Sequence, residues 1–331
     1  MQKYSIDNYN YNLPRELIRQ EPPELREDSR LMHIEGDYIS DRKFPDILNI
    51  LSKGDLLILN RTRVRKALIY GKKITGGVLK ITVLERNEEG FVCLIAGKVR
   101  NNDIITVGNR EVKVKIREDG KRIITGNIDW DYLEGIGHLP LPPYIKRRQD
   151  FSYYQNEIGN EIGSIAAPTA SLHFSNDLLN KIRAKGVKVS FALLTVGYGT
   201  FKSIEDEDIR GHVVDEEDIQ VSEDLVNDIE NAKGKIIGVG TTVVRSLETA
   251  SFSGILRPYS GLTRIYIYPG YKFNSGLTHL ITNFHIPKSS LLALVYAFGG
   301  EERIKMAYRK AIENKYYFFS LGDAMILDKE N

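Results

Sequence analysis

Six short β-branched runs with no helix between them are the feature that most limits how this chain can fold. They lie between about Ala67 and Trp130, and glycine-containing turns separate several of them. Such runs between turn signals predict strands, and their close spacing predicts a small antiparallel barrel or sandwich. The expected strands are Leu68–Tyr70, Val78–Leu84, Phe91–Ile95, Ile104–Val107, Val112–Ile116 and Arg122–Ile124.

On both sides of this region, apolar runs alternate with helical patterns. Leu56–Leu59 is expected as a buried strand, Val187–Val196, Lys235–Val239 and Ile265–Tyr268 as further strands, and Ser175 as the cap of a helix. Strands that alternate with helices are typical of α/β proteins. We therefore predict an α/β body made of residues 1–64 and 152–331, with residues 65–151 inserted as a small antiparallel β-barrel domain.

Composition narrows the class of protein. The 331 residues are 42% hydrophobic and carry a net charge of +2, which is too small to indicate nucleic-acid binding by itself. A single cysteine, Cys93, argues against a disulfide framework and a cysteine-rich metal site. The most apolar run, Ser290–Phe298, is too short to cross a bilayer. We expect a soluble cytoplasmic protein without a membrane partner or a bound metal.

Positive charge gathers at the two ends of the predicted insertion. Arg61, Arg63 and Arg65 alternate with uncharged residues, so an extended strand would place them on one face. The second group is Lys146, Arg147 and Arg148. Together they suit a phosphate-rich partner. A solvated edge strand is the alternative for the first group.

Polar residues follow the expected strand at 235–239. Gly240, Thr241 and Thr242 open a helix whose free backbone N–H groups could bind an anion or a ribose hydroxyl. The same helix carries Arg245 and Glu248, and their spacing of three also fits a structural ion pair. The acidic residues at 205–218 are expected to form an exposed loop around His212.

The segment Leu280–Gly300 combines a strand end, a polar corner and a buried helix. Thr282, Asn283 and His285 follow the apolar strand, and Ser289 or Ser290 can cap the helix. Polar groups between two buried elements indicate a site. The alternative is a corner whose polar groups only satisfy one another.

Several of these segments together resemble the S-adenosylmethionine:tRNA ribosyltransferase-isomerase family of queuosine biosynthesis. The matching residues run in family order over nearly the whole chain. They include Tyr11-Asn12-Leu13-Pro14, Pro140-Leu141-Pro142-Pro143-Tyr144-Ile145, Ala166-Ala167-Pro168-Thr169, Leu172-His173-Phe174, Val239-Gly240-Thr241-Thr242, Thr282-Asn283-Phe284-His285 and Gly322-Asp323-Ala324-Met325.

The resemblance implies transfer and isomerisation of the ribosyl group of S-adenosylmethionine onto a 7-aminomethyl-7-deazaguanine in tRNA. The products would be epoxyqueuosine-tRNA, adenine and methionine. S-adenosylmethionine would be a substrate, with no separate cofactor, and we expect a monomer. Two alternatives stay open: a tRNA-binding relative with lost or altered transfer activity, and a nucleoside-transferring enzyme that does not use RNA.

The resemblance also implies roles for individual residues. His173 or His285 would be the base, while Glu248 and Asp323 would orient the sulfonium or the acceptor amine. Substrate-binding positions would be Thr169, Gly240, Thr241, Thr242, Arg245, Asn283, Lys288 and Ser289. The tRNA would contact Arg61, Arg63, Arg65, Lys146, Arg147 and Arg148. The family's histidine-x-methionine-histidine-x-glutamate segment appears here as His212, Val214, Asp215 and Glu217, without the second histidine.

Overall fold

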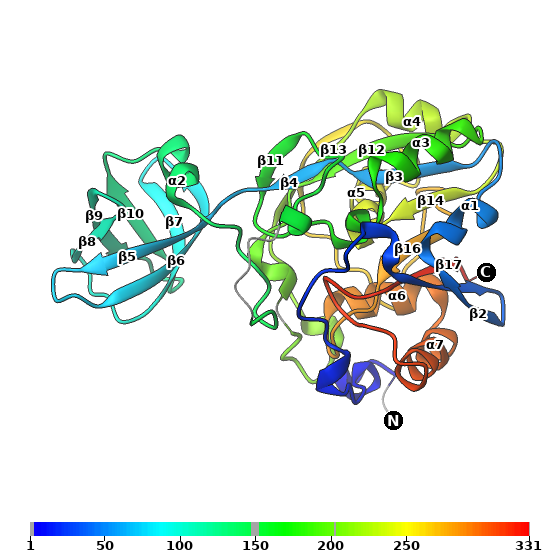
Figure 1. Cartoon of the computed structure of the whole chain (residues 1–331), viewed down its shortest axis with the longest axis horizontal. Helices are drawn as coiled ribbons and strands as arrows, with labels where there is room; N and C mark the ends of the chain where they lie inside the picture. Colours follow the sequence, from blue (N-terminus) through cyan, green and yellow to red (C-terminus); the bar gives the residue numbers. More distant parts are fainter. Residues whose placement is uncertain (1–2, 147–151, 202, 331) are drawn as a thin grey trace. The chain divides into compact units, whose positions relative to one another are not determined.

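The chain forms two compact units (Figure 1). The computed structural model describes residues 3–146, 152–201 and 203–330. One unit comprises Met1–Arg63, Pro142–Ile162 and Ala167–Asn331, and the other comprises Val64–Leu141 and Gly163–Ala166. The first contains a mixed nine-stranded sheet with helices, and the second contains a closed antiparallel barrel. The predicted fold class is confirmed.

The sheet of the first unit has a parallel centre and antiparallel edges. Its order is β15-β13-β12-β3-β14-β16-β17-β1-β2. The neighbours β12, β3, β14 and β16 run parallel to one another, so their carboxyl ends meet at one edge. The strands are β1 Arg30–Glu35, β2 Tyr38–Lys43, β3 Leu56–Asn60, β12 Lys188–Leu194, β13 Glu217–Val221, β14 Ile236–Val239, β15 Tyr259–Thr263, β16 His279–Asn283 and β17 Ala324–Asp328.

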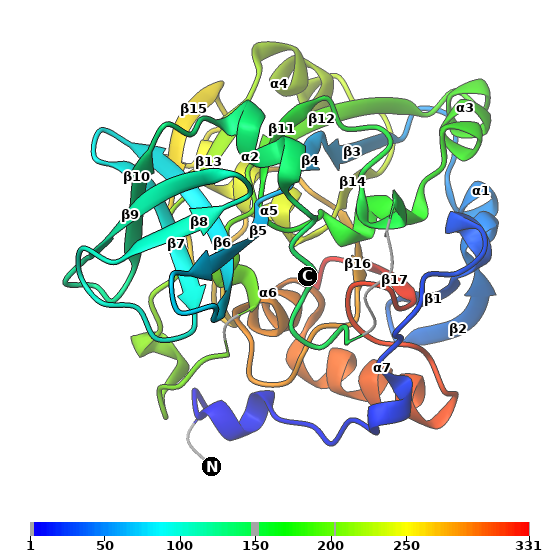
Figure 2. The same ribbon diagram turned by 60° about the vertical axis from the view of Figure 1, so that its left-hand side comes forward.

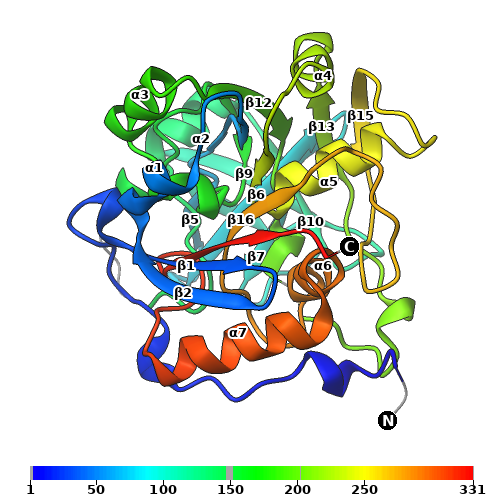
Figure 3. The same ribbon diagram turned by 90° about the vertical axis from the view of Figure 1, so that its right-hand side faces the viewer.

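Both faces of this sheet are buried, because apolar residues alternate between two cores. Leu56 and Ile58 join one core, and Leu57 and Leu59 join the other. The first core also contains residues of helices α4 Glu223–Glu230, α5 Thr241–Ala250, α6 Ser290–Gly299 and α7 Glu301–Glu313. The second contains residues of α1 Ile47–Ile50, α3 Asn176–Ala184 and the 3-10 helix η6 Thr169–His173. The unit is a three-layer α/β fold (Figure 3).

The second unit is a barrel of strands in the order β10-β7-β6-β5-β8-β9 (Figure 2). The strands are β5 Leu68–Lys73, β6 Val78–Asn87, β7 Gly90–Ala96, β8 Ile104–Val107, β9 Arg110–Ile116 and β10 Arg122–Gly126. Each of the six predicted strands is present. The helix α2 Trp130–Ile136 packs on the barrel through Trp130, whose ring lies edge-on to Phe91 at 5.0 Å. Cys93 is buried in the barrel, and burial raises the pKa of its thiol to about 12.

Two local expectations are wrong. Residues 265–268 do not form a strand, and the sheet edge is instead built by β15 at Tyr259–Thr263. The alternating run of arginines is not one continuous strand, because β3 ends at Asn60 and β4 spans only Thr62–Val64, which pairs with β11 Glu161–Ser164. The other short 3-10 helices are η1 Ile6–Tyr9, η2 Arg15–Leu17, η3 Arg26–Asp28, η4 Phe44–Asp46, η5 Ser152–Tyr154, η7 Tyr198–Phe201 and η8 Ile209–Gly211.

The segment 280–300 folds as its sequence indicates. The strand β16 ends at Asn283, and Ser289 caps α6 by accepting a hydrogen bond from the backbone N–H of Leu292 at 3.2 Å. The helix is apolar around most of its circumference and largely buried. Between the two elements, the fully buried Phe284 packs against the rings of Tyr308 and Phe318 at 5.4 and 5.0 Å. This aromatic cluster fixes the path of the polar corner.

Replacing Phe284 with alanine tests the importance of this cluster. The change leaves a cavity among rigid rings, so we expect the free energy of unfolding to fall by about 3–5 kcal/mol. Urea unfolding followed by fluorescence measures it. The control is Phe252→Ala, because Phe252 is 83% exposed and its loss should cost less than about 0.5 kcal/mol. Equal effects of the two changes would contradict the assignment.

Candidate active site

Small and polar residues stand where the parallel strands end. Gly240 follows β14, Asn283 ends β16, and the chain after β12 reaches Gly197 and Gly199. The backbone N–H of Gly240 donates to the carbonyl of Ile281 at 2.7 Å, which ties two of these ends together. Gly240 has a φ of 91°, a left-handed value that favours glycine at the start of α5. Ligands bind at this edge in open α/β sheets.

His173 and Asn283 meet inside the unit. The Nε2 atom of His173 lies 3.1 Å from the side-chain Nδ2 of Asn283, and its Nδ1 lies 3.0 Å from the hydroxyl of Ser29. Because Asn283 donates to Nε2, these contacts favour a proton on Nδ1. Burial, helped by the charges of Arg19 and Arg26, lowers the pKa of His173 to about 3. The imidazole is therefore neutral at physiological pH.

His285 is also held by contacts within the protein. Its Nε2 lies 2.9 Å from the hydroxyl of Thr282, and its backbone N–H donates to the hydroxyl of Tyr308 at 2.9 Å. Burial lowers the pKa of His285 to about 3. A group with so low a pKa is a weak general base at neutral pH.

Glu248 holds a loop. Its carboxylate accepts hydrogen bonds from the backbone N–H groups of Asn274 and Ser275, at 3.0 and 3.1 Å, and from the hydroxyl of Tyr271 at 3.2 Å. The hydroxyl of Ser275 donates to it as well. The carboxylate is fully buried. These contacts account for both oxygen atoms and position the segment 271–275.

Asp323 has a similar arrangement. One carboxylate oxygen accepts from the backbone N–H of Arg30 at 2.8 Å, and the other accepts from the backbone N–H of Tyr317 at 2.7 Å. Burial raises the pKa of Asp323, and the two hydrogen bonds oppose that shift. The carboxylate therefore joins β1 to the loop before β17.

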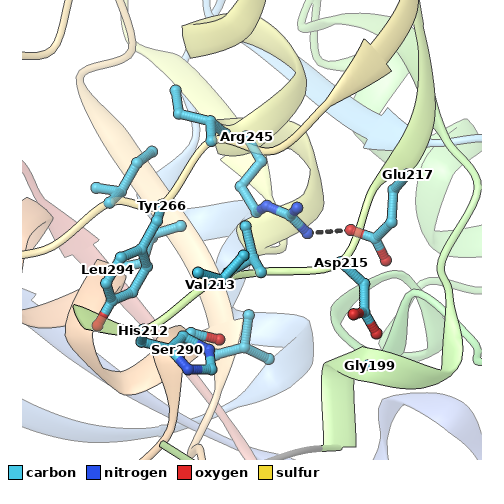
Figure 4. Close-up of a pocket in the computed structure, with 13 residues that line it drawn as sticks. Gly199, His212, Val213, Asp215, Glu217, Arg245, Tyr266, Ser290 and Leu294 are labelled. Atoms are coloured by element: carbon cyan, nitrogen blue, oxygen red, sulfur yellow. Dashed lines mark hydrogen bonds and ion pairs between the residues drawn. The ribbon is translucent and has the colours of Figure 1, made fainter. Parts of the chain in front are cut away.

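A pocket in the α/β unit brings together Arg245 and Glu217 as a buried ion pair (Figure 4). Glu217 also accepts a hydrogen bond from the backbone N–H of Gly197 at 2.7 Å. The alternative of an ion pair between Arg245 and Glu248 is wrong, because Arg245 pairs with Glu217 instead. The pocket is lined by Gly199, His212, Val213, Val214, Asp215, Glu217, Arg245, Ile265, Tyr266, Ile267, Ser290, Leu291 and Leu294.

Most acidic residues at 205–218 are exposed, as expected, but the segment before β13 also contributes to this pocket. Glu217 is only 6% exposed, and the ring of His212 lies edge-on to that of Tyr266 at 5.3 Å. His212, Asp215 and Glu217 are not among the site residues that the sequence predicts. The signal that could have found them is their match to the family's histidine- and glutamate-containing segment.

The remaining predicted substrate-binding residues have different surroundings. The hydroxyl of Thr242 is buried and has no hydrogen-bond partner among the described residues, and the same holds for the side-chain oxygen of Asn283. Thr169 begins η6, and Ser289 caps α6. Lys288 has a left-handed φ of 56°, and its Nζ lies 3.4 Å from Asp7. Thr242 and Asn283 thus keep unused acceptors.

The predicted tRNA-binding arginines differ in their contacts. Arg61 donates to the side-chain oxygen of Gln220 at 2.7 Å. In the barrel unit, Arg65 pairs with Glu134 at 3.3 Å and stacks over Trp130 at 4.1 Å. Such contacts reduce the freedom of Arg65 to bind a phosphate.

Arg63 lies in β4 and is partly exposed. Lys146 is exposed, whereas Arg147 and Arg148 lie outside the described residues. Within 3–146, 152–201 and 203–330, we find no cluster of histidine, cysteine and acidic residues suited to a metal ion. Nor is any helix in those ranges both long and apolar enough to span a membrane.

Comparison with known proteins identifies the family. A sequence model described as "Queuosine biosynthesis protein" matches residues 6–327. The S-adenosylmethionine:tRNA ribosyltransferase-isomerase of Francisella philomiragia is 42% identical over 97% of this chain and 99% of its own length. The chain belongs to this ribosyltransferase-isomerase family. The enzyme of the same description from Thermosynechococcus vestitus is 41% identical, over 98% of this chain and 96% of its own.

The fold of the ribosyltransferase-isomerase family is also seen in a solved structure. The crystal structure of S-adenosylmethionine tRNA ribosyltransferase from Thermotoga maritima is 32% identical in sequence and has a TM-score of 0.56. The match covers 96% of this chain and 99% of that one. The family assignment therefore extends over both units.

Replacing Glu248 with glutamine tests its positioning role. The amide cannot accept all the donors that face the carboxylate, so we expect the free energy of unfolding to fall by about 1–3 kcal/mol. Urea unfolding measures the effect, with Glu230→Gln at the exposed end of α4 as the control. Unchanged stability together with lost turnover would instead indicate contact with substrate.

The low pKa of His173 predicts acid sensitivity. Between about pH 6.5 and 3 the unfolded chain binds a proton at this residue and the folded protein does not, so stability falls as the pH falls through that window. From pH 7 to pH 5 the contribution is about 2 kcal/mol. From pH 7 to pH 5, we expect the free energy of unfolding of His173→Asn to fall by about 2 kcal/mol less than that of the wild type, as measured by urea unfolding. An identical pH dependence in both proteins would refute the shifted pKa.

Proposed function

We propose that this enzyme uses the pocket beside Arg245 to hold S-adenosylmethionine while its ribosyl group is transferred to tRNA. The reaction transfers and isomerises that group onto 7-aminomethyl-7-deazaguanine in tRNA, giving epoxyqueuosine-tRNA, adenine and methionine. The observation that carries the location is the buried ion pair of Arg245 and Glu217 in a pocket of the α/β unit. Gly199, α5 and α6, which follow three parallel strands, contribute to its lining.

The chemistry sets requirements for this site. The sulfonium acidifies the protons on the adjacent ribose carbon, so a base can form an ylide there. The acceptor amine must be neutral to attack, and adenine must be protonated or hydrogen-bonded as it leaves. A site that meets these needs holds a cation, excludes water and presents acceptors to the adenosine.

Thr242 and Asn283 are our candidates for binding the adenosine. Each has a buried oxygen without a partner in the described part of the chain, and a ribose hydroxyl or the adenine amino group can donate to such an oxygen. Thr242 lies one helical turn from Arg245, so the two side chains share a face of α5. We also propose that Gly240, Thr241 and Thr169 line the part of the site that binds the adenosine.

We propose that a histidine is the general base. His173 and His285 stay candidates from the family resemblance, but burial lowers the pKa of each to about 3. His212 lines the pocket itself and is a third candidate. For Glu248 and Asp323 we propose a positioning role, since backbone N–H groups bind their carboxylates. Lys288 and Ser289 would shape the corner that precedes α6.

The decisive assay is product release. We expect adenine and methionine to form from S-adenosylmethionine only when tRNA carrying the 7-aminomethyl-7-deazaguanine is present, and liquid chromatography measures both products. Unmodified tRNA is the control. A protein that binds tRNA but releases neither product would fit the alternative, a relative with lost or altered transfer activity.

For tRNA binding we propose Arg61, Arg63, Lys146, Arg147 and Arg148, with Arg65 chiefly supporting the barrel. Neutralising Arg63 with glutamine should weaken tRNA binding and lower the salt slope of the affinity by about one if Arg63 contacts a phosphate. Filter binding at several salt concentrations tests this.

The control for Arg63→Gln is Lys181→Gln, since Lys181 is exposed on α3 and pairs with Asp177 of the same helix at 2.6 Å. Unchanged tRNA affinity and salt slope in Arg63→Gln would contradict a phosphate contact at Arg63, and unchanged activity after neutralising Arg63, Arg65 and Arg147 would favour an enzyme that does not use RNA. We further propose that the protein acts as a monomer in the cytoplasm, and sedimentation of the full chain tests the first point.

A further inference from the structure

Three charged side chains line the pocket: Arg245, Glu217 and Asp215 (Figure 4). They are one cation and two anions, the reverse of the methionyl sulfonium, which has two cations and one carboxylate. We infer that this pocket recognises the amino-acid end of S-adenosylmethionine, with Arg245 binding the carboxylate and Asp215 binding the α-ammonium group. This inference rests on the proposed function and specifies how the substrate is oriented.

One terminal nitrogen of the Arg245 guanidinium group has no hydrogen-bond partner among the described residues. Its Nη1 pairs with Glu217, whereas its buried Nη2 has no hydrogen-bond partner among the residues described. Only 10% of the side chain is exposed. An unpaired buried donor is costly, and a ligand carboxylate removes that cost. The planar fork of arginine also matches the two oxygens of a carboxylate.

Glu217 fixes the direction of this guanidinium group. One of its oxygens pairs with Arg245, and the other accepts the backbone N–H of Gly197 at 2.7 Å. The glutamate is anchored to the chain after β12 and holds Arg245 from a second element, β13. The remaining arm of Arg245 is therefore preorganised, which lowers the entropic cost of binding.

Asp215 lies against the chain after β12. A Cβ atom added at Gly199 would approach within 2.8 Å of the carboxyl carbon of Asp215, so a side chain at position 199 would displace this acid from its present position. Both residues line the pocket. A carboxylate accepts several hydrogen bonds at once, and a primary ammonium group offers three donors. Asp215 thus suits the α-ammonium of the ligand.

Apolar and aromatic side chains complete the match. Val213, Ile265, Leu291 and Leu294 line the pocket and suit the methylene groups of the methionyl chain. Tyr266 adds an aromatic ring, and ring faces attract cations such as a sulfonium. With a net charge of −1 from its three charged groups, the pocket complements a ligand fragment of net charge +1.

Comparing the affinities for two ligands distinguishes recognition of the amino-acid end from binding of the adenosine. S-adenosylmethionine has the amino-acid end and the sulfonium, whereas 5′-methylthioadenosine lacks both. The test variant is Arg245→Lys, which keeps a cation for Glu217 but loses the second arm. We expect its affinity for S-adenosylmethionine to fall about 10- to 100-fold by titration calorimetry, with affinity for 5′-methylthioadenosine unchanged.

A second variant, Asp215→Asn, tests the inference independently in case Arg245→Lys does not fold. Asp215→Asn removes the charge from a residue at the pocket wall and should lower affinity for S-adenosylmethionine about tenfold or more, again without affecting 5′-methylthioadenosine. The control is Arg264→Lys, because Arg264 pairs with Glu216 at 2.8 Å and its side chain is 67% exposed. It should change neither affinity.

The outcomes are distinguishable. Loss of selectivity between the two ligands in both variants supports the inference, provided that their thermal unfolding matches the wild type. Equal weakening of both ligands, or no weakening of either, overturns it while the wild-type enzyme still releases adenine and methionine. Absence of that release in the wild type would instead defeat the proposed function.

Discussion

The parallel arrangement of β12, β3, β14 and β16 is the constraint on which the rest of the α/β unit depends. It buries both faces of the sheet and brings the four carboxyl ends to one edge. Backbone groups beyond these ends leave the sheet ladder, so glycine, threonine and asparagine are useful there. The pocket takes residues from the segment after β12, from the helix after β14 and from the helix after β16. The location of the pocket follows from the sheet.

Buried polar groups in this unit fall into two sets with different consequences. The carboxylates of Glu248 and Asp323 are satisfied by donors of the protein, so they hold loops in place. Arg245 and Thr242, in contrast, each bury a polar atom that no described residue satisfies. Because an unsatisfied buried group is costly, its retention points to a ligand that completes the hydrogen bond. This contrast is consistent with the positioning roles proposed for Glu248 and Asp323 and with the binding roles proposed for Arg245 and Thr242.

Local patterns in the sequence were sufficient for much of the fold. The six barrel strands were predictable because β-branched runs and glycine turns are short-range signals. The corner at 280–300 was predictable because a strand end, a capping serine and an apolar helix follow one another directly. The family resemblance supplied the reaction, which residue chemistry alone did not give.

Contacts between distant segments were not predictable in the same way. The spacing of Arg245 and Glu248 suggested a pair on one helix, yet Arg245 pairs with Glu217, 28 positions away. Glu217 looked exposed because its neighbours are acidic, but the edge pairing of β13 buries it. Residues 265–268 are apolar and still form no strand, since β15 at Tyr259–Thr263 pairs with β13 instead.

The central claim is that S-adenosylmethionine binds at the carboxyl edge of the sheet, in the pocket between α5, α6 and the segment before β13. A crystal structure of the full chain with bound S-adenosylmethionine tests it most directly. The account predicts that the carboxylate of the ligand lies within hydrogen-bond distance of Nη2 of Arg245. Ligand bound elsewhere, with the pocket at Arg245 empty, would contradict it.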